Sequence, residues 1–273
     1  MRANRARKKL LEGGLISGPS LYFPAPEIAE EAAQYGFDFV WIDWQHGGWS
    51  EATISAAMAA FTNVSTVPLV RTLGPDPAWI GRVLDLGALG VIVPMVETPA
   101  QCEAIVRAAK FPPRGSRSAT GLRTPYHAKQ ERYDYLQGAF DYTQRSNEQI
   151  LTIVMVETAT GVQNVREMMA VPDIDCVLIG PYDLSRSLGA ERMSDRQVED
   201  LVQEVLSASR ATGVAAGYVT NSPAEAESRA AQGFRMVCPG HDITQLVEAF
   251  NEMRKCAERL VEKNRTMPES GKN

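Results

Sequence analysis

The feature of this sequence that most constrains its fold is a regular alternation of short apolar runs with longer amphipathic stretches. The apolar runs have the length of buried strands and lie at 14–20, 38–43, 66–71, 90–94, 150–156, 175–179, 214–219 and 235–238. Stretches with helical periodicity alternate with them, at 26–35, 51–61, 76–87, 98–109, 161–169, 195–211, 222–232 and 242–263. Such an alternation is typical of parallel strands joined by helical crossovers.

Eight predicted strands and eight predicted helices in strict alternation favour one α/β architecture, the closed (β/α)8 TIM barrel. The chain has 273 residues, and one such barrel takes roughly 250 residues, so we predict a single domain over 1–273. The alternative is an open doubly wound sheet. However, the first predicted strand is not followed by the GxGxxG motif of a dinucleotide-binding fold.

The two ends of the chain predict additions to the barrel. Residues 2–12 are basic and should form a short N-terminal helix that packs over the barrel bottom, ended by Gly13-Gly14. The 242–263 pattern predicts a long C-terminal helix, and the polar residues 264–273 predict a frayed tail. The N-terminus lacks the apolar run of a signal peptide, and no stretch reaches the roughly 18 apolar residues of a membrane span, so we predict a cytoplasmic protein.

Charge and cysteine usage narrow the partners and the compartment. The formal net charge of −5 argues against a nucleic acid or an anionic membrane as partner, because either would require a basic face. The four cysteines form no CxxC pair and predict a buried, reduced set in a cytosolic protein: Cys102, Cys176, Cys238 and Cys256.

One connection breaks the rhythm of the chain. About 40 residues separate the 98–109 helix from the strand near 150, and they include the run FPPRGSRSATGLRTPYH. Loops longer than about 12–15 residues are usually functional or disordered. Residues 131–143 could form a helix inside this insertion.

Polar residues at the carboxyl ends of barrel strands are the ones expected to act in catalysis. They are Asp43 and His46 after the second predicted strand, Arg71 after the third, Glu157 after the fifth, and the Gly180-Pro181-Tyr182-Asp183 turn after the sixth. Glu157 and Asp183 follow neighbouring strands, so their carboxylates can converge on a hard cation such as Mg²⁺ or Mn²⁺. The alternative is that Glu157 caps a helix beginning near Thr160 and that Asp183 caps the DLSRS turn.

His46 and Arg71 are each open to a catalytic and a structural interpretation. A carboxylate of Asp43 bonded to one ring nitrogen of His46 would fix the tautomer and raise the basicity of the other nitrogen. Otherwise His46 is a structural hydrogen-bonding residue. Arg71 ends an apolar strand and needs an anion. That anion is either a substrate oxygen, which suits the forked guanidinium, or Asp43 or Asp85 in an ion pair.

The remaining histidines, methionines and tryptophans are given structural roles. We expect His127 and His241 to be loop residues, and Trp44 to be a possible pocket wall. The other tryptophans and four of the methionines are predicted to be packing residues: Trp41, Trp49, Trp79, Met95, Met155, Met168 and Met169.

Several landmarks occur together in a fixed order, from about Gly14 to Leu260. They are FDFVWIDWQHG, VPLVR, LDLGALGVIVPMVET, FPPRGSR, IVMVET and VLIGPYDLSRSLG. With this set the chain resembles the HpcH/HpaI aldolases, class II pyruvate aldolases that include the 4-hydroxy-2-oxoheptanedioate (2,4-dihydroxyhept-2-ene-1,7-dioate) aldolases. It resembles macrophomate synthase and the citrate lyase β subunits more distantly.

The resemblance implies a role for each strand-end residue. Glu157 and Asp183 match the family's ligands of a divalent cation (Mg²⁺, Mn²⁺ or Co²⁺), His46 its catalytic base, and Arg71 the arginine that holds the reacting oxygen. Asp43 and Asp85 match acidic residues that support the histidine and its hydrogen-bond network. The backbone at Gly180, Pro181, Tyr182 and Asp183 would bind the pyruvate carboxylate. We expect Trp44, Gln45, Trp49 and the 114–127 segment to contact the aldehyde half of the substrate.

The activity implied is the reversible cleavage of a small-molecule 4-hydroxy-2-oxo acid to pyruvate and an aldehyde. The bound cation stabilises the enolate, and His46 takes the 4-hydroxyl proton directly or through water. No strand-end lysine stands ready for a Schiff base, which favours the metal mechanism. The resemblance also implies a homo-oligomer, a hexamer built as a trimer of dimers with exchanged C-terminal helices, although 242–263 could equally close its own barrel.

The sequence departs from the family pattern at two positions. Gln45 stands where the family usually has Glu before the histidine, and Met155 stands where it usually has Gln two residues before the metal-binding Glu. These changes keep open an oxaloacetate decarboxylase, or an enolate-adding enzyme like macrophomate synthase, on the same site. A barrel that has lost catalysis and serves as a scaffold is a further alternative, against which the intact His46, Arg71, Glu157 and Asp183 speak.

Overall fold

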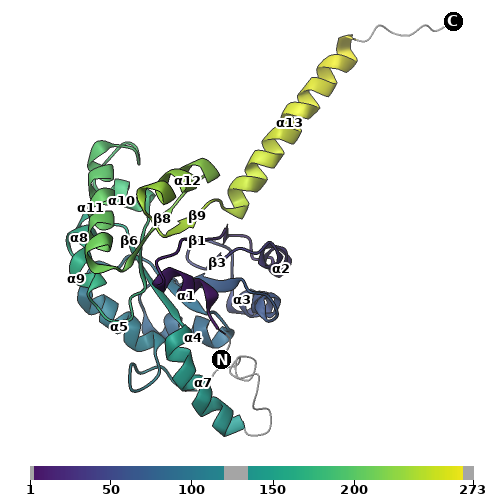
Figure 1. Cartoon of the computed structure of the whole chain (residues 1–273). Helices are drawn as coiled ribbons and strands as arrows, with labels where there is room; N and C mark the ends of the chain where they lie inside the picture. The colour runs from purple at the N-terminus through teal and green to yellow at the C-terminus, as the bar shows by residue number, and fades with distance from the viewer. Residues whose placement is uncertain (1–2, 120–134, 267–273) are drawn as a thin grey trace, which may run out of the picture.

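The computed structural model describes residues 3–119 and 135–266 and shows parallel strands surrounded by helices (Figure 1). The strands are β1 (Ile16–Ser17), β2 (Ser20–Leu21), β3 (Phe39–Asp43), β4 (Val67–Arg71), β5 (Gly90–Val93), β6 (Leu151–Val156), β7 (Cys176–Ile179), β8 (Ala215–Val219) and β9 (Met236–Cys238). They form one sheet in the order β1-β9-β8-β7-β6-β5-β4-β3-β2. Each neighbouring pair is parallel.

The helices lie on the outside of the sheet and at its ends. They are α1 (Arg5–Leu11), α2 (Pro26–Gln34), α3 (Glu51–Ala57), the 3-10 helix η1 (Met58–Phe61), α4 (Pro77–Leu86), α5 (Pro99–Ala109), α7 (Tyr135–Gln149), α8 (Ala159–Gln163), α9 (Val165–Met169), α10 (Pro181–Ser187), α11 (Arg196–Thr212), α12 (Pro223–Gln232) and α13 (Asp242–Thr266). Their alternation with the strands follows the order predicted from the sequence.

The first strand of the barrel is interrupted and closes the sheet. β1 pairs with β9 and β2 pairs with β3, so the segment from Ile16 to Leu21 joins both ends of the sheet. Gly18 lies between the two halves, where an added Cβ would stand 1.8 Å from the Phe39 carbonyl oxygen. β1 and β2 therefore occupy one strand position, and with the other seven strands they confirm the predicted (β/α)8 barrel.

Alternation along the strands divides the core into two layers. One layer fills the barrel interior and includes Phe39, Trp41, Leu69, Ile153 and Met155. The other layer, formed by the intervening outward-facing residues, packs against the helices. Because side chains alternate with a period of two, the residues that continue the inward series at the strand ends also face the interior. This register aims polar strand-end side chains into the barrel mouth.

α1 closes the bottom of the barrel, as predicted. Its Ala6 and Leu10 are buried with the interior layer. Asn4 caps the helix and its amide nitrogen donates to the Leu89 carbonyl at 2.9 Å. Arg7 forms an ion pair with the buried Asp175 at 2.9 Å.

The structure corrects several local predictions. The predicted helix over 161–169 is two short helices, α8 and α9, that meet at Asn164. α10 forms where a turn was expected. The predicted insertion helix over 131–143 begins outside the described residues, where His127 also lies, and α7 continues to Gln149. The predicted tail 264–273 lies mostly outside the described residues.

Two burial predictions are wrong in part. Cys102, Cys176 and Cys238 are buried and free as expected, but Cys256 is exposed on α13. Of the methionines predicted as core, Met95 is 45% exposed. Trp79 is only partly buried, although it packs against the core.

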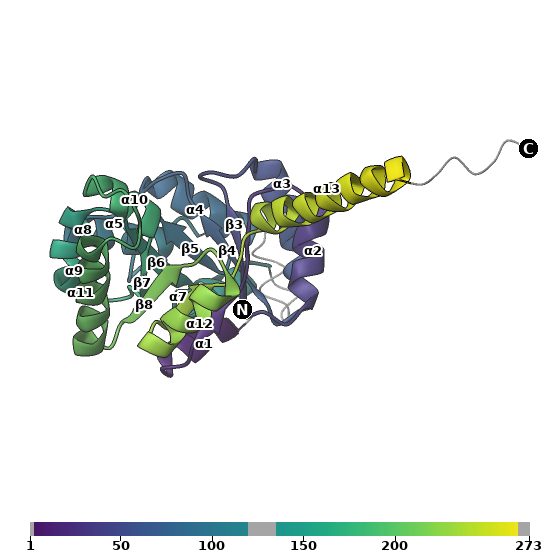
Figure 2. The same cartoon turned by 90° about the horizontal axis from the view of Figure 1, so that it is seen from above.

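α13 projects away from the barrel instead of packing along it (Figures 1 and 2). Its exposed apolar side chains are Ile243, Leu246, Val247, Phe250, Met253, Leu260 and Val261. Among the described helices, none is long and apolar enough to cross a membrane.

Candidate active site

Asp43 and Arg71 form a buried ion pair at the mouth of the barrel. Asp43 ends β3 and Arg71 ends β4, and the two residues are register partners in the sheet. Arg71 donates from Nε to Asp43 Oδ1 at 3.0 Å and from Nη2 to Asp43 Oδ2. Its guanidinium lies 5.1 Å from the centre of the Trp41 ring below. The sequence allowed three anions for Arg71: a substrate oxygen, Asp43 or Asp85. Within this chain the anion is Asp43.

The predicted bond between Asp43 and the His46 ring is absent. Asp43 instead accepts the backbone N–H of His46 at 3.1 Å, and the His46 residue is exposed. The reason is geometric: Asp43 points into the barrel toward the guanidinium, which offers two charge-assisted donors, whereas the ring is carried three residues further into the turn. His46 thus lies at the rim and is exposed to solvent.

Glu157 is a buried carboxylate at the same mouth, two strands along the sheet from Arg71. It follows β6, is 2% exposed, and accepts the Met95 backbone N–H at 2.7 Å. Met95 adopts a left-handed conformation with φ of 57°, which a side chain such as Met rarely takes and which aims this N–H at the carboxylate. Burial raises the pKa of Glu157, and the negative charge of Asp183 adds to the rise.

Asp183 lies in the first turn of α10, which begins directly after β7. Gly180 precedes the helix, and an added Cβ there would stand 2.9 Å from a Glu157 carboxylate oxygen. The first helical bond runs from the Leu184 N–H to the Gly180 carbonyl. No side chain caps α10, so the N–H groups of Tyr182 and Asp183 stay outside the helical hydrogen bonds. Pro181 has no N–H to offer.

Three residues named in the sequence analysis, Trp44, Gln45 and Met155, lie near this mouth. Trp44 is buried and packs edge-on against Trp79, with ring centres 5.3 Å apart. Gln45 is half-buried, and its Oε1 has no hydrogen-bond partner among residues 3–119 and 135–266. Met155, which replaces the family's usual glutamine, is buried with its sulfur 3.8 Å from Arg71 Nη1.

Within its own chain, Asp85 does not lie at the barrel mouth. It lies in the last turn of α4, and that turn leads into the amino end of β5 at the bottom of the barrel. Its carboxylate accepts Arg117 Nη2 at 2.7 Å. The Arg117 guanidinium also stacks 4.5 Å from the centre of the Phe111 ring.

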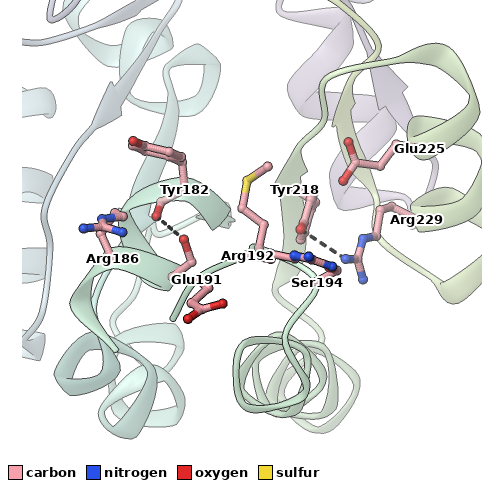
Figure 3. A pocket seen from close by; sticks show the side chains of 10 residues that line it. Tyr182, Arg186, Glu191, Arg192, Ser194, Tyr218, Glu225 and Arg229 are labelled. Carbon is pink, nitrogen blue, oxygen red and sulfur yellow. Dashed lines mark hydrogen bonds between the residues drawn. The ribbon is translucent and has the colours of Figure 1, made fainter. Parts of the chain in front are cut away.

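A pocket of about 520 Å³ borders the site on its outer side (Figure 3). Tyr182, Arg186 and Glu191 lie on one wall, and Tyr218, Glu225 and Arg229 on the other. Arg229 is already bound to Glu199 at 2.9 Å and to the Tyr218 hydroxyl at 3.1 Å. Tyr182 lines this pocket and is also one of the predicted substrate-binding residues.

Sequence reasoning missed two contributors to the mouth. Met95 contributes its backbone N–H, which binds Glu157, and no sequence pattern predicts a methionine with positive φ. Tyr22, whose pKa is raised by burial and by the negative charge of Asp43, follows β2. Because the first strand was predicted to end at residue 20, Tyr22 was left out of the strand-end residues, and extending that strand to Leu21 would have found it.

This barrel, with acidic and basic groups gathered at the carboxyl ends of its strands, has the architecture of an enzyme. The family described as HpcH/HpaI aldolase/citrate lyase matches residues 21–249. The chain belongs to this family, and it is an aldehyde-lyase of the aldolase type. The resemblance seen in the sequence is thereby confirmed.

Proteins of similar sequence align with this chain over nearly its full length. A hydroxypyruvate/pyruvate aldolase from Chromohalobacter salexigens is 32% identical, covering 90% of this chain and 94% of its own. A 2-keto-3-deoxy-L-rhamnonate aldolase from Salmonella gallinarum is 31% identical, covering 91% of each. Among solved structures, an HpcH/HpaI aldolase/citrate lyase family protein from Burkholderia cenocepacia matches with a TM-score of 0.83 and 28% identity, covering 94% of this chain and 100% of its own.

Proposed function

We propose that this enzyme is a divalent-metal-dependent aldolase that reversibly cleaves a 4-hydroxy-2-oxo acid to pyruvate and an aldehyde. The observation that carries the proposal is the Glu157 carboxylate, buried beside the charge of Asp183 and near the Asp43–Arg71 pair. Asp183 itself is exposed. A buried carboxylate such as Glu157 beside a second negative charge is costly unless a cation neutralises it.

The donor set of the mouth fits a hard cation. Glu157 and Asp183 offer oxygen ligands, which Mg²⁺, Mn²⁺ and Co²⁺ can all use. No group of three or more His, Cys, Asp or Glu side chains suited to a metal occurs in the described part of the chain. A two-carboxylate site leaves the other ligand positions to substrate oxygens and water. When bound, the cation would supply positive charge that stabilises an enolate.

The chain's own groups orient the pyruvyl half of the substrate. The free N–H groups of Tyr182 and Asp183 at the start of α10 are suited to its carboxylate. The Arg71 fork is fixed on Asp43 through Nε and Nη2, and its remaining N–H bonds can point at the 2-keto oxygen. A donor fixed before the reaction stabilises the negative charge that grows on that oxygen during cleavage.

His46 is the proposed base. In the cleavage direction its ring, directly or through water, accepts the proton of the 4-hydroxyl group. The electron pair of that O–H bond forms the aldehyde carbonyl as the C3–C4 bond breaks, and the C3–C4 electrons form the pyruvate enolate. Protonation at C3 then gives pyruvate. The exposed position of His46 at the rim suits a group that exchanges its proton with solvent.

The aldehyde half would lie against Trp44 and Gln45. Because Gln45 Oε1 has no partner among the described residues, a hydroxyl group on the aldehyde could donate to it. This favours a hydroxylated aldehyde, a class in keeping with the sugar-acid name of the Salmonella gallinarum relative. The same face would accept smaller aldehydes at lower affinity.

The test is pyruvate release from a panel of 4-hydroxy-2-oxo acids and from oxaloacetate, with Mg²⁺ or Mn²⁺ and again with EDTA. We expect metal-dependent cleavage of a hydroxy-oxo acid that EDTA abolishes. Activity on oxaloacetate alone would replace the aldolase with a decarboxylase and direct attention to Gln45 and Met155. Cleavage that EDTA leaves intact would remove the metal from the proposal.

We further propose that the enzyme is a homo-oligomer, a trimer of dimers in which α13 is exchanged between copies. In a single chain α13 leaves its apolar side chains exposed (Figure 2). Leu15, Phe23 and Tyr35 are also exposed near the first strand and α2, where the α13 of a second copy could cover them. Light scattering should give the hexamer mass, and a monomer at micromolar concentration would contradict the assembly.

The catalytic role of Asp85 depends on this assembly. Because its carboxylate lies at the barrel bottom of its own chain, it can support His46 only in the site of a neighbouring copy. Asp85→Asn then lowers kcat in the oligomer while the isolated fold stays intact. An unchanged kcat together with a lower melting temperature would restrict Asp85 to its bond with Arg117.

A further inference from the structure

Arg71 rests on two residues of the barrel interior that were expected only to pack. Trp41 lies two residues before Asp43 on β3, and Met155 lies two residues before Glu157, on β6. Because side chains alternate along a strand, both face the interior, one layer below the acidic groups. The Arg71 guanidinium lies over the Trp41 ring, 5.1 Å from its centre, and Nη1 donates to the Met155 sulfur at 3.8 Å.

The printed contacts of Arg71 use three of the five N–H groups of its guanidinium. Nε and Nη2 donate to Asp43, and Nη1 donates to Met155. Two N–H groups, one on each terminal nitrogen, are left. Because the guanidinium is planar and rigid, the three bonds and the ring beneath it fix the direction in which these two N–H groups point.

The indole of Trp41 is poorly suited to packing alone. Trp41 is 1% exposed, and its Nε1 has no hydrogen-bond partner among residues 3–119 and 135–266. A buried donor without a partner is unfavourable, and a phenylalanine or leucine would fill the interior without one. What the indole adds is a ring face that attracts a cation more strongly than the face of any other aromatic side chain. The contact with Arg71 therefore explains a tryptophan at this position.

Met155 complements the ring because its thioether is an uncharged, polarizable and weak acceptor. A second carboxylate in its place would oppose the negative charge of a substrate oxygen that approaches Arg71. From these contacts we propose that Trp41 and Met155 are positioning residues. They form a platform that holds the Arg71 guanidinium and directs its two remaining N–H groups toward the 2-keto oxygen of the substrate. The inference rests on the proposed aldolase function.

The first test is Met155→Leu, which removes the sulfur and nearly keeps the side-chain volume. We expect kcat to fall about fivefold with KM changed by less than about twofold, because a guanidinium held less firmly loses transition-state stabilisation more than ground-state binding. Met155→Gln restores an acceptor for Nη1 and should recover most of the loss. A Met155→Leu enzyme with unchanged kcat, or an equal loss in Met155→Gln, would overturn the role of the sulfur.

Met168→Leu is the matched control for this series. Met168 is fully buried like Met155, but it belongs to the outer layer of the core. The same substitution there should leave kcat unchanged. An equal fall in kcat in Met168→Leu would show that loss of buried packing, and not the contact with Arg71, lowers the turnover of Met155→Leu.

The second test separates the Trp41 ring face from its volume. Trp41→Phe keeps an aromatic face and should keep kcat within about twofold of the wild type, whereas Trp41→Leu should lower kcat about 10-fold with little change in KM. Phe39→Leu removes a ring from the same strand and the same interior layer, and it should lower the melting temperature without lowering kcat. Equal losses of kcat in the two Trp41 variants, or unchanged kcat in Trp41→Leu, would overturn the role of the ring.

Crystal structures of Trp41→Leu and Met155→Leu test the platform without turnover. The guanidinium of Arg71 should turn out of its wild-type plane in both variants. A guanidinium that keeps its wild-type position in both would overturn the proposal, whatever the activity. A wild type inactive on the whole substrate panel would overturn the proposed function instead, and these structures would still decide whether Trp41 and Met155 hold Arg71.

Discussion

The two ends of the barrel treat buried charge in opposite ways. At the bottom, Asp175 binds Arg7, and Lys110 donates to the carbonyls of Asn147 and Ile150 at 2.8 and 3.0 Å. At the mouth, Asp43 and Arg71 pair with each other, but Glu157 is buried with a raised pKa beside Asp183. The Glu157 carboxylate accepts one backbone N–H and has no ion pair among the described residues.

This difference separates stability from function in the molecule. A fully paired buried group costs little to keep, and removing its partner costs several kcal/mol. A buried carboxylate with a raised pKa and a methionine with positive φ are each unfavourable for folding, and such features cluster at functional sites. Changes at the mouth should therefore alter turnover, and changes at the bottom should alter unfolding.

The largest effect is expected at Glu157. Glu157→Gln removes a charged metal ligand and should lower kcat by more than about 10³-fold. The amide can still accept the Met95 N–H, and the fold no longer carries a desolvated charge, so the melting temperature should stay equal or rise. Steady-state kinetics and thermal unfolding check both. A large loss of stability would place Glu157 with the structural residues of the bottom.

His46→Ala should lower kcat by about 10²-fold or more, because a general base typically contributes 10²–10⁴-fold. The residue is exposed and its ring makes no hydrogen bond or ion pair within the described residues, so stability and metal binding should stay near the wild type. Binding of Mn²⁺, measured by titration, is the control. Near-normal turnover would remove His46 from the role of base and leave Arg71 as the group to examine.

At the bottom, Asp175→Ala should lower the free energy of unfolding by about 3 kcal/mol, because it removes the carboxylate that pairs with Arg7 and accepts the Thr152 N–H. kcat at 25 °C should not change. Asp200→Ala is the control, because the Arg196–Asp200 pair is exposed and such pairs contribute about 0–1 kcal/mol. A loss of activity without a loss of stability would break the separation of the two ends.

The smallest effect is a pH dependence of the free energy of unfolding, caused by Lys110. Burial lowers the pKa of this amine to about 8. Between that pH and the ordinary lysine value, the unfolded chain binds more protons than the folded one, so stability rises with pH, by at most about 1.4 kcal/mol per pH unit. Urea unfolding of wild type and Lys110→Met over pH 7–10 checks this. The difference should grow in favour of wild type above pH 8, and parallel curves would contradict it.

The sequence alone determined the strand and helix order, because a period of two or of about 3.6 is written in the residues themselves. It also determined the family, from landmarks such as IVMVET and GPYDLSRSLG, and with it the residues that gather at the strand ends. The short interruption at Gly18-Pro19 and the break at Asn164 were hidden, because a strand or helix tolerates such features according to its neighbours.

Only the tertiary structure decided how the gathered groups pair. Asp43 could bond to the His46 ring or to Arg71, and barrel register favours the guanidinium because both side chains face the interior. Asp85 reads as an active-site acid in the sequence, yet its place at the end of α4 puts it at the other end of its own barrel. Met95 reaches Glu157 only through its backbone conformation, and His241, expected in a loop, is buried beside Ser20 only because the barrel closes there. Local patterns fix which residues lie on which face, but partners far apart in the chain are chosen by geometry that no local pattern encodes.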